Sequence, residues 1–322
     1  MPTGGGPQPP TSSSGAHGRK LRARWLLIPS VAFAALFGGA LWYGSVLTAP
    51  VHRVPGPLPP GLEGREVEFL SDSGSWIRGW YIPGCQGRGG VVLMHDVRSD
   101  RRSMLRRARF LNGYGYHVLL FDFQAHGSSG GETITFGSLE AHDARAAVEF
   151  LRAEIPTEPI AAIGVSLGGA ASVLGPEPLP VEALVLEAVY SDIREAIKAR
   201  LGIRFGPLAA GLTPLFTLQL KPRLGVGVDD LRPLEGIARI RCPVLVIGGT
   251  HDRRTPPEQT RQLFAAAPSP KDLWIVPGAS HADFHRFAEP EYEAQILNFL
   301  NTHLATPWAS SGALPPGDTD LR

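Results

Sequence analysis

The sequence predicts an α/β fold in which a doubly wound, mostly parallel sheet is covered by helices on both faces. Two observations support this prediction. Short apolar runs alternate with helical segments along the chain, which is typical of strands buried on both faces of a sheet. The part between the termini has about 240 residues, which suits a single α/β domain.

The expected elements follow in chain order. Residues 66–69 and 76–81 predict an opening antiparallel hairpin around Ser71-Asp72-Ser73-Gly74. Apolar runs predict parallel strands at Gly90–Met94, Tyr116–Phe121, Ile160–Gly164, Ala183–Glu187, Val244–Gly248 and Leu273–Val276. The helices are expected near Ser103–Leu111, Leu139–Ala153, Gly168–Val173, Pro257–Ala266 and Glu291–Leu304.

The stretch from Ile193 to Ala238 interrupts this alternation. It is too long for a plain connection and carries apolar pieces such as Phe205-Gly206-Pro207-Leu208. We expect residues 193–238 to form a small helical lid above the site. Such a lid would admit an acyl or other hydrophobic group, or would contact a membrane surface. A purely structural cover is the alternative.

One serine lies where a strand is predicted to turn into a helix. Ser166 is the centre of Gly164-Val165-Ser166-Leu167-Gly168, directly after the apolar run over 159–163. The glycines leave room for a strained turn, and the helix N-terminus favours negative charge. A serine hydroxyl becomes a nucleophile when such a turn exposes it beside a base. The pattern also arises by chance, so it needs partners.

Two partners follow. Asp252 comes just after the strand predicted at Val244–Gly248, and His281 comes just after the strand predicted at Leu273–Val276. The order Ser, Asp, His is that of a catalytic triad on an α/β sheet. His281 would take the proton from Ser166 and return it to the leaving group, and Asp252 would orient the imidazole. Asp192 is the alternative acid.

From about Val67 to Leu304 the chain resembles the α/β-hydrolase superfamily, nearest to its serine-aminopeptidase-like and acyl-esterase-like branch. The resemblance covers the triad order, the strand at 91–95 and the segment 122–129, which has D-x-x-x-x-G-x-S spacing. It also covers the acid-bearing segment 242–252, which Thr255-Pro256-Pro257 follows. The resemblance implies acyl transfer by a serine, with no cofactor and no metal.

The expected oxyanion hole departs from the family at one position. The family usually has His-Gly where this chain has His95-Asp96. The resemblance implies that the backbone N–H groups of Val97 and Leu167 bind the oxyanion. Aspartate tolerates a left-handed backbone, but its charge would oppose a developing oxyanion if the side chain pointed inward. Alternatively, Asp96 points away and bonds within its own loop.

These residues predict a membrane-anchored serine hydrolase that cleaves an ester, thioester or amide of a small-molecule acyl substrate through an acyl-enzyme. The fold alone does not select the bond. One alternative is a catalytically weak or inactive binding protein on the same fold, which only Asp96 favours. A haloperoxidase-like or lyase-like use of the triad is a further alternative.

The N-terminal part predicts the anchor. Residues 1–24 are rich in Gly, Pro and Ser, end in a basic cluster, and are expected to be disordered and cytoplasmic. Residues 25–49 carry no charge and, at roughly 37 Å as a helix, are long enough to cross a bilayer. The catalytic domain would then be extracytoplasmic. A cleaved signal peptide, and hence a secreted enzyme, is the alternative.

Composition sets the remaining expectations. The Pro-rich residues 50–64 predict a stiff spacer, residues 65–305 the hydrolase domain, and residues 306–322 a disordered tail. A net charge of +1 without a basic stripe argues against nucleic acid. Cys85 and Cys242 have neither metal spacing nor a disulfide framework. The sequence gives no oligomeric state.

Four histidines outside the triad have structural interpretations. His95 and His126 are expected to support loops, and His251 is expected to point away from the acid beside it. His285 could share a helix face with His281, but no carboxylate motif suggests a metal site there.

Overall fold

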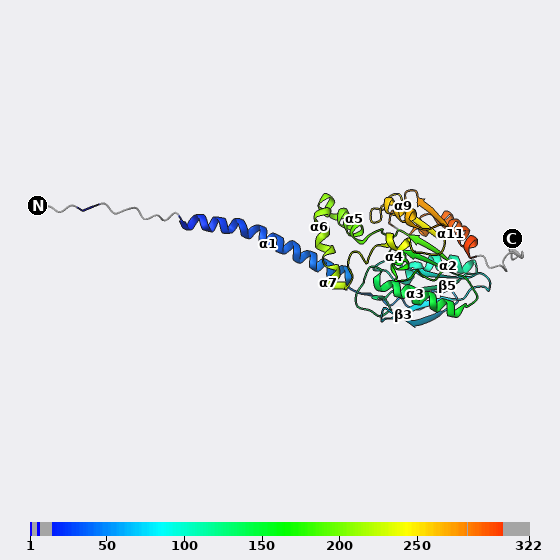
Figure 1. The fold of residues 1–322 in the computed structure, drawn as a ribbon. Helices are drawn as coiled ribbons and strands as arrows, with labels where there is room; N and C mark the ends of the chain where they lie inside the picture. The colour runs from blue at the N-terminus through cyan, green and yellow to red at the C-terminus, as the bar shows by residue number, and fades with distance from the viewer. Residues whose placement is uncertain (2–4, 7–14, 282, 305–322) are drawn as a thin grey trace, which may run out of the picture. The chain divides into compact units, whose positions relative to one another are not determined.

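The structure is a computed structural model that describes residues 1, 5–6, 15–281 and 283–304. The chain divides into two compact units, Met1–Val46 and Leu47–Arg322. The predicted C-terminal tail, residues 306–322, lies outside the described residues. Figure 1 shows the ribbon coloured along the chain.

The first unit is dominated by a single helix. Helix α1 (Gly15–Thr48) contains an apolar portion, Ser30–Thr48, of 19 residues with a mean hydropathy of 1.5. That portion is long and apolar enough to cross a membrane, although a signal sequence passes the same test. Helix α1 begins at Gly15 and so includes residues 15–24 of the segment 1–24, whose disorder stays a prediction. Ala, Leu, Lys and Arg in this part of α1 are good helix formers.

The second unit is built on an eight-stranded sheet with the order β10-β9-β8-β7-β4-β5-β3-β2. Only β3 pairs antiparallel, with β5 on one side and β2 on the other; the remaining pairs are parallel. The strands are β2 (Arg65–Leu70), β3 (Trp76–Ile82), β4 (Gly90–Met94), β5 (His117–Asp122), β7 (Ile160–Val165), β8 (Ala183–Glu187), β9 (Val244–Gly249) and β10 (Lys271–Val276). The predicted mostly parallel sheet is confirmed.

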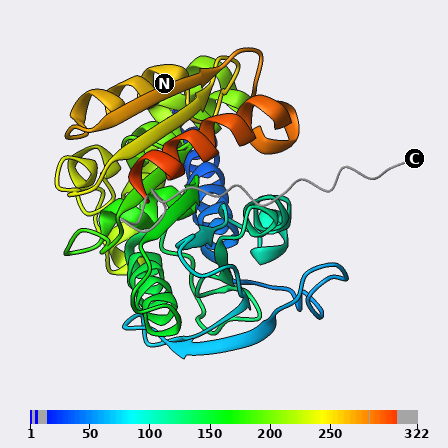
Figure 2. The ribbon, with the colours of Figure 1, turned by 90° about the vertical axis from the view of Figure 1, so that its right-hand side faces the viewer.

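Helices cover both faces of this sheet. They are η1 (Arg101–Met104), α2 (Leu105–Gly113), α3 (Ser138–Glu154), α4 (Leu167–Leu174), α9 (Pro257–Ala266), α10 (Phe284–Phe287) and α11 (Glu289–His303). One apolar cluster packs α3, α4 and α9 onto the sheet, and a second packs α2 and α11 onto it. Figure 2 shows α11 in red and α3 in green on opposite sides of the strands. The arrangement is therefore doubly wound.

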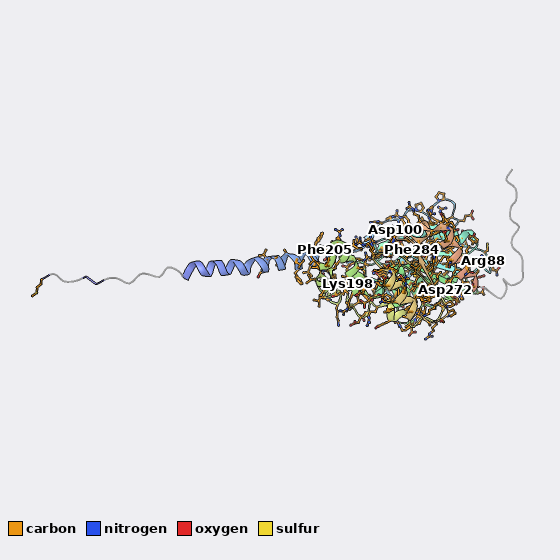
Figure 3. All side chains as sticks on the ribbon, turned by 90° about the horizontal axis from the view of Figure 1, so that it is seen from above. Arg88, Asp100, Lys198, Phe205, Asp272 and Phe284 are labelled. Carbon is orange, nitrogen blue, oxygen red and sulfur yellow. The ribbon has the colours of Figure 1, made fainter. Side chains whose placement is uncertain are left out.

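The interval between β8 and β9 is helical, as predicted for the lid. It contains α5 (Ile193–Phe205), η2 (Gly206–Leu208), α6 (Ala209–Thr217), α7 (Leu220–Leu224) and α8 (Pro233–Ile237). Leu220 and Ile237 are buried in the cluster on the α3 side, whereas Leu208 and Leu218 are exposed. In Figure 3, Lys198 and Phe205 of α5 lie at one end of the domain and Arg88 at the other. Coverage of the site by these helices stays a prediction.

The proline-rich segment after α1 is not a free spacer throughout. Strand β1 (Val51–His52) pairs in parallel with β6 (His126–Gly127) in a separate two-stranded sheet. Val51 N–H donates to the Ala125 carbonyl at 2.7 Å, and Val51 is buried. The predicted boundary at residue 65 is therefore wrong, because the domain already begins with β1. A strand of two residues is too short to show the alternation of apolar and polar residues from which strands are predicted.

Candidate active site

Ser166 sits at a strained turn between β7 and α4. Its backbone has φ 50° and ψ −102°, in a region that residues other than glycine seldom adopt. The Ser166 N–H donates to the Glu187 carbonyl of neighbouring β8 at 2.8 Å. A Cβ at Gly168 would come within 2.5 Å of the Met94 carbonyl oxygen, so only glycine lets α4 approach β4 this closely. The turn has the geometry expected of a nucleophile elbow.

Asp252 and His281 are brought together although they are far apart in sequence. His281 Nδ1 lies 2.8 Å from Asp252 Oδ2. Asp252 is buried in the turn after β9, and His281 is partly buried in the loop after β10. Nδ1–H is therefore the donor to the carboxylate, which leaves Nε2 free of a proton and able to act as a base.

The carboxylate of Asp252 is held by its own turn. It accepts hydrogen bonds from the Arg254 N–H at 2.8 Å and the Thr255 N–H at 2.9 Å, both through Oδ1. Thr255 Oγ1 donates to Oδ2 at 2.6 Å. Burial alone would raise the pKa of Asp252, but the hydrogen bonds from His281 and Thr255 outweigh it and lower that pKa. Asp252 is thus an ionised partner for His281 at neutral pH.

Topology places Ser166 on the same edge of the sheet as this pair. Ser166, Asp252 and His281 follow β7, β9 and β10, which run parallel in one sheet. The carboxyl ends of parallel strands meet at one edge, where ligands bind in open α/β sheets. Among the hydrogen bonds of the described residues, none joins Ser166 to His281. Catalytic hydrogen bonds are often formed only with substrate bound.

Two buried histidines hold the loop that follows β4. His95 Nδ1 donates to the Asp96 carbonyl at 2.7 Å, and His95 Nε2 accepts from the Phe123 N–H at 3.1 Å. His126 Nε2 accepts from the Arg98 N–H at 3.0 Å, and His126 Nδ1 donates to the Gln124 carbonyl at 2.9 Å. The peptide groups on both sides of residue 97 are therefore fixed.

Both histidines act as neutral rings in these positions. Burial, together with the smaller effect of the neighbouring His95, lowers the pKa of His126 from its ordinary value of 6.5 to about 4. Burial likewise lowers the pKa of His95. A neutral ring can donate at Nδ1 while it accepts at Nε2, as both histidines do. The expectation that they support loops agrees with this geometry.

The proposed oxyanion donors lie on either side of the serine turn. Val97 is partly buried between the two fixed peptides, and Leu167 is the first residue of α4. Within the described part of the chain, neither backbone N–H donates a hydrogen bond to another protein group. Two such unpaired amides are what an oxyanion hole requires.

The backbone around Asp96 differs from our expectation. The left-handed conformation falls on Arg98, at φ 62°, and not on Asp96. The glycine usual in the family is thus not needed here for a positive φ at residue 96. Asp96 is partly buried, and its carbonyl accepts from both His95 Nδ1 and the Ser99 N–H. Both contacts are made by the main chain of Asp96 and hold the loop around it.

The other candidates have different roles. Asp192 caps α5, accepts from the Arg194 N–H at 2.6 Å and pairs with Arg232 at 3.5 Å. These contacts favour Asp252 as the acid. His251 is exposed.

His285 is fully buried, and its Nε2 lies 2.9 Å from Glu293 Oε1. Ligand atoms of His285, Glu289 and Glu293 lie within 4.8 Å of one another. These are carboxylates that sequence reasoning did not find, because α10 and α11 bring them together. Glu289 is already paired with Arg106 at 2.8 Å, which competes with a metal.

Sequence reasoning missed two supporting groups. Thr255 follows the acid-bearing segment without a role that the sequence reveals, yet its hydroxyl and its N–H donate to Asp252. Arg107 lies in the run Arg106-Arg107-Ala108-Arg109, and such a cluster of like charges resembles a solvated helix face in the sequence. It is buried instead, with carboxylates around it.

Comparisons with known proteins agree with this geometry. The model of the alpha/beta hydrolase family matches residues 91–295. The uncharacterized protein Rv2307c of Mycobacterium tuberculosis is 34% identical over 238 residues, which are 73% of this chain and 77% of that protein. The alpha/beta hydrolase domain-containing protein WAV2 of Arabidopsis thaliana is 25% identical over 289 residues, 86% of this chain and 92% of WAV2.

Among solved structures, the Pyrococcus furiosus esterase Pf2001 aligns with a TM-score of 0.67 and 22% identity. The alignment covers 80% of this chain and 98% of that one, and it supports the fold. The family model covers most of the sheet and the turns after β7 and β9. The chain therefore belongs to the alpha/beta hydrolase family.

Proposed function

We propose that this protein is a serine hydrolase that cleaves an ester, thioester or amide through an acyl-enzyme on Ser166. The observation that carries the proposal is the 2.8 Å contact between His281 Nδ1 and Asp252 Oδ2, at the same sheet edge as the strained serine turn. A buried carboxylate that fixes one imidazole tautomer is the partner that a catalytic base needs, and Ser166 supplies a hydroxyl at the same edge of the sheet.

The reaction follows from these positions. His281 Nε2 takes the proton from Ser166 Oγ as the oxygen attacks the substrate carbonyl, and the carbonyl π electrons move to its oxygen. The N–H groups of Val97 and Leu167 bind the resulting oxyanion. Collapse expels the leaving group, which takes the proton from His281. Water then attacks the acyl-enzyme by the same route, and this step releases the acid and restores Ser166.

The oxyanion donors are an important part of the proposal. Removal of one such donor costs about 3 to 4 kcal/mol in comparable hydrolases. The Val97 N–H is held by its neighbours, because His95 binds the peptide carbonyl before it and His126 binds the Arg98 N–H after it. A donor that is already oriented loses little free energy to reorganisation during the reaction.

We place the enzyme at a membrane through α1. The apolar portion Ser30–Thr48 supports an anchor, and the basic residues that precede residue 25 favour a cytoplasmic N-terminus. The catalytic domain would then face the other side. Release after signal cleavage is the competing outcome, and the N-terminal sequence of the mature protein decides between them.

Turnover of p-nitrophenyl esters of increasing acyl length tests the chemistry, with the detergent-solubilised full chain. The wild type should release nitrophenolate in a Ser166-dependent manner, and Ser166→Ala should reduce the rate by at least about 10³-fold. Turnover that survives Ser166→Ala would refute the proposal. A folded wild type without any turnover would favour the binding-protein alternative that Asp96 suggests.

A further inference from the structure

A buried arginine lies between the turn that carries Ser166 and the loop that carries His281. Arg107 in α2 is 2% exposed. Its Nη2 lies 2.6 Å from Glu187 Oε2, and its Nη1 lies 2.9 Å from Asp283 Oδ1. Its Nε donates to the Tyr292 hydroxyl at 2.9 Å, and that hydroxyl donates to Glu187 Oε1 at 2.6 Å. Arg107 is thus fixed by three partners from β8, α11 and the loop before α10.

Two of these partners are tied to the proposed catalytic groups. The main-chain carbonyl of Glu187 accepts the Ser166 N–H at 2.8 Å. Asp283 lies two positions after His281 and caps α10, where its side chain accepts from the Arg286 N–H at 3.4 Å. The guanidinium therefore joins the residue behind the serine turn to the loop that carries the histidine.

We propose that Arg107 is a positioning residue that sets the distance between His281 and Ser166, by holding Asp283 and Glu187 on one guanidinium. This inference rests on the proposed function. A guanidinium presents its donors in a rigid plane, so it can fix two carboxylates relative to each other, whereas an ammonium cannot. A misplacement of about 1 Å in a reacting group can cost about 100-fold in rate.

The energetics agree with a positioning role. Glu187 is fully buried, and a buried ion pair is poor evidence of added stability, because desolvation offsets the attraction. Full hydrogen bonding of every partner makes such a network rigid. The arm to Asp283 is different, since that carboxylate is 35% exposed. Removal of the Asp283 carboxylate therefore leaves the buried Arg107–Glu187 pair intact. It tests the position of the His281 loop with little effect on folding.

The chain offers a matched control. Arg106, one position earlier in α2, pairs with Glu289 of α11 at 2.8 Å, and both side chains are exposed. This pair links α2 to α11, as Arg107 does through Tyr292, but neither of its residues belongs to the serine turn or to the His281 loop. Arg106→Ala should therefore leave catalysis unchanged, as expected for an exposed ion pair worth about 0–1 kcal/mol.

The experiment compares Asp283→Ala, Asp283→Asn, Arg107→Lys and Arg106→Ala in the full chain. Asp283→Ala should lower kcat about tenfold with KM unchanged and with a thermal midpoint close to that of the wild type. Asp283→Asn should restore most of kcat, because its amide oxygen can accept from Arg107 and cap α10. Arg107→Lys should lower kcat at least as much, since one ammonium cannot span both carboxylates.

Hydrogen exchange in the segment 277–283 provides a readout that does not need turnover. Exchange there should be faster in Asp283→Ala than in the wild type and in Arg106→Ala. An unchanged kcat and unchanged exchange in Asp283→Ala would overturn the inference, as would an Asp283→Asn variant no better than Asp283→Ala. A wild type without turnover refutes the proposed function alone, and the exchange comparison then decides this inference.

Discussion

His126 Nε2 accepts the N–H of Arg98 at 3.0 Å, across 28 positions of sequence. This contact and the bond from His95 Nδ1 to the Asp96 carbonyl hold the peptide groups on either side of Val97. A protonated His126 would present a second donor to the Arg98 N–H instead of an acceptor. The integrity of the proposed oxyanion loop therefore depends on a neutral ring.

This dependence predicts a loss of stability in acid. The pKa of His126 is about 4 in the folded protein against an ordinary value of 6.5, so the unfolded chain binds the extra proton between these values. The contribution of His126 is fully present above pH 6.5 and is lost as the pH falls towards 4. The free energy of unfolding should decrease by about 3 kcal/mol over that window.

Urea unfolding at pH 7.5, 5.5 and 4.5 measures this effect, with His126→Gln as the non-titrating variant. Asp143 acts in the opposite direction, because burial raises its pKa to about 7. The difference between the wild type and His126→Gln isolates the histidine. If the two proteins lose stability equally between pH 7.5 and 4.5, His126 does not supply the acid sensitivity.

The Thr255 hydroxyl supports the proposed acid. It donates to Asp252 Oδ2 at 2.6 Å, on the oxygen that also binds His281. Thr255→Val should lower kcat about threefold to tenfold, which corresponds to one lost hydrogen bond. Thr260→Val is the matched control, because Thr260 Oγ1 is buried without a partner among the described residues. Equal losses of activity in both variants would contradict this role.

The charge of Asp96 should oppose the oxyanion. Asp96 is partly buried next to Val97, where a carboxylate is less screened than at the surface. Asp96→Asn should raise kcat about threefold without a change in KM. Asp72→Asn, in the exposed turn between β2 and β3, controls for net charge. A kcat that does not respond to Asp96→Asn would mean that the carboxylate points away from the site.

The segment after α1 should be part of the folded domain. Ile134 N–H donates to the Thr48 carbonyl at 2.9 Å, and Arg53 N–H donates to the Gly127 carbonyl at 3.0 Å. Deletion of residues 1–46 should preserve the thermal midpoint, whereas deletion of residues 1–53 should lower it by about 5–10 °C. Calorimetry of the two truncations measures the difference. Equal midpoints would show that β1 adds no stability.

The inner strands of the sheet could be predicted from the sequence because they are apolar on both faces. Met94 and the three residues before it in β4 are each fully buried, so the run itself marks the strand. The candidates Ser166 and Asp252 could be proposed for a similar reason, since each follows a buried apolar run, and His281 follows the apolar but only partly buried run at the end of β10. Their residue types carry the chemistry without reference to packing.

The contacts that support the candidate site could not be predicted from apolar runs, because they join residues that are far apart in the sequence. Arg107 bonds Glu187 across 80 positions and Asp283 across 176. Strand β1 pairs with His126–Gly127 without a periodic pattern of its own. Arg98 takes a left-handed conformation, which nothing in its residue type predicts. Local propensity does not determine such contacts, whereas the assembled sheet does.

The central claim is that Ser166 is activated by His281 and Asp252. The most direct measurement is the rate of labelling by a fluorophosphonate, followed by intact mass, for the wild type, Ser166→Ala and His281→Ala. The account predicts one adduct on the wild type, none on Ser166→Ala and labelling slowed at least about 100-fold in His281→Ala. Labelling of His281→Ala at the wild-type rate, or an adduct on Ser166→Ala, would contradict it.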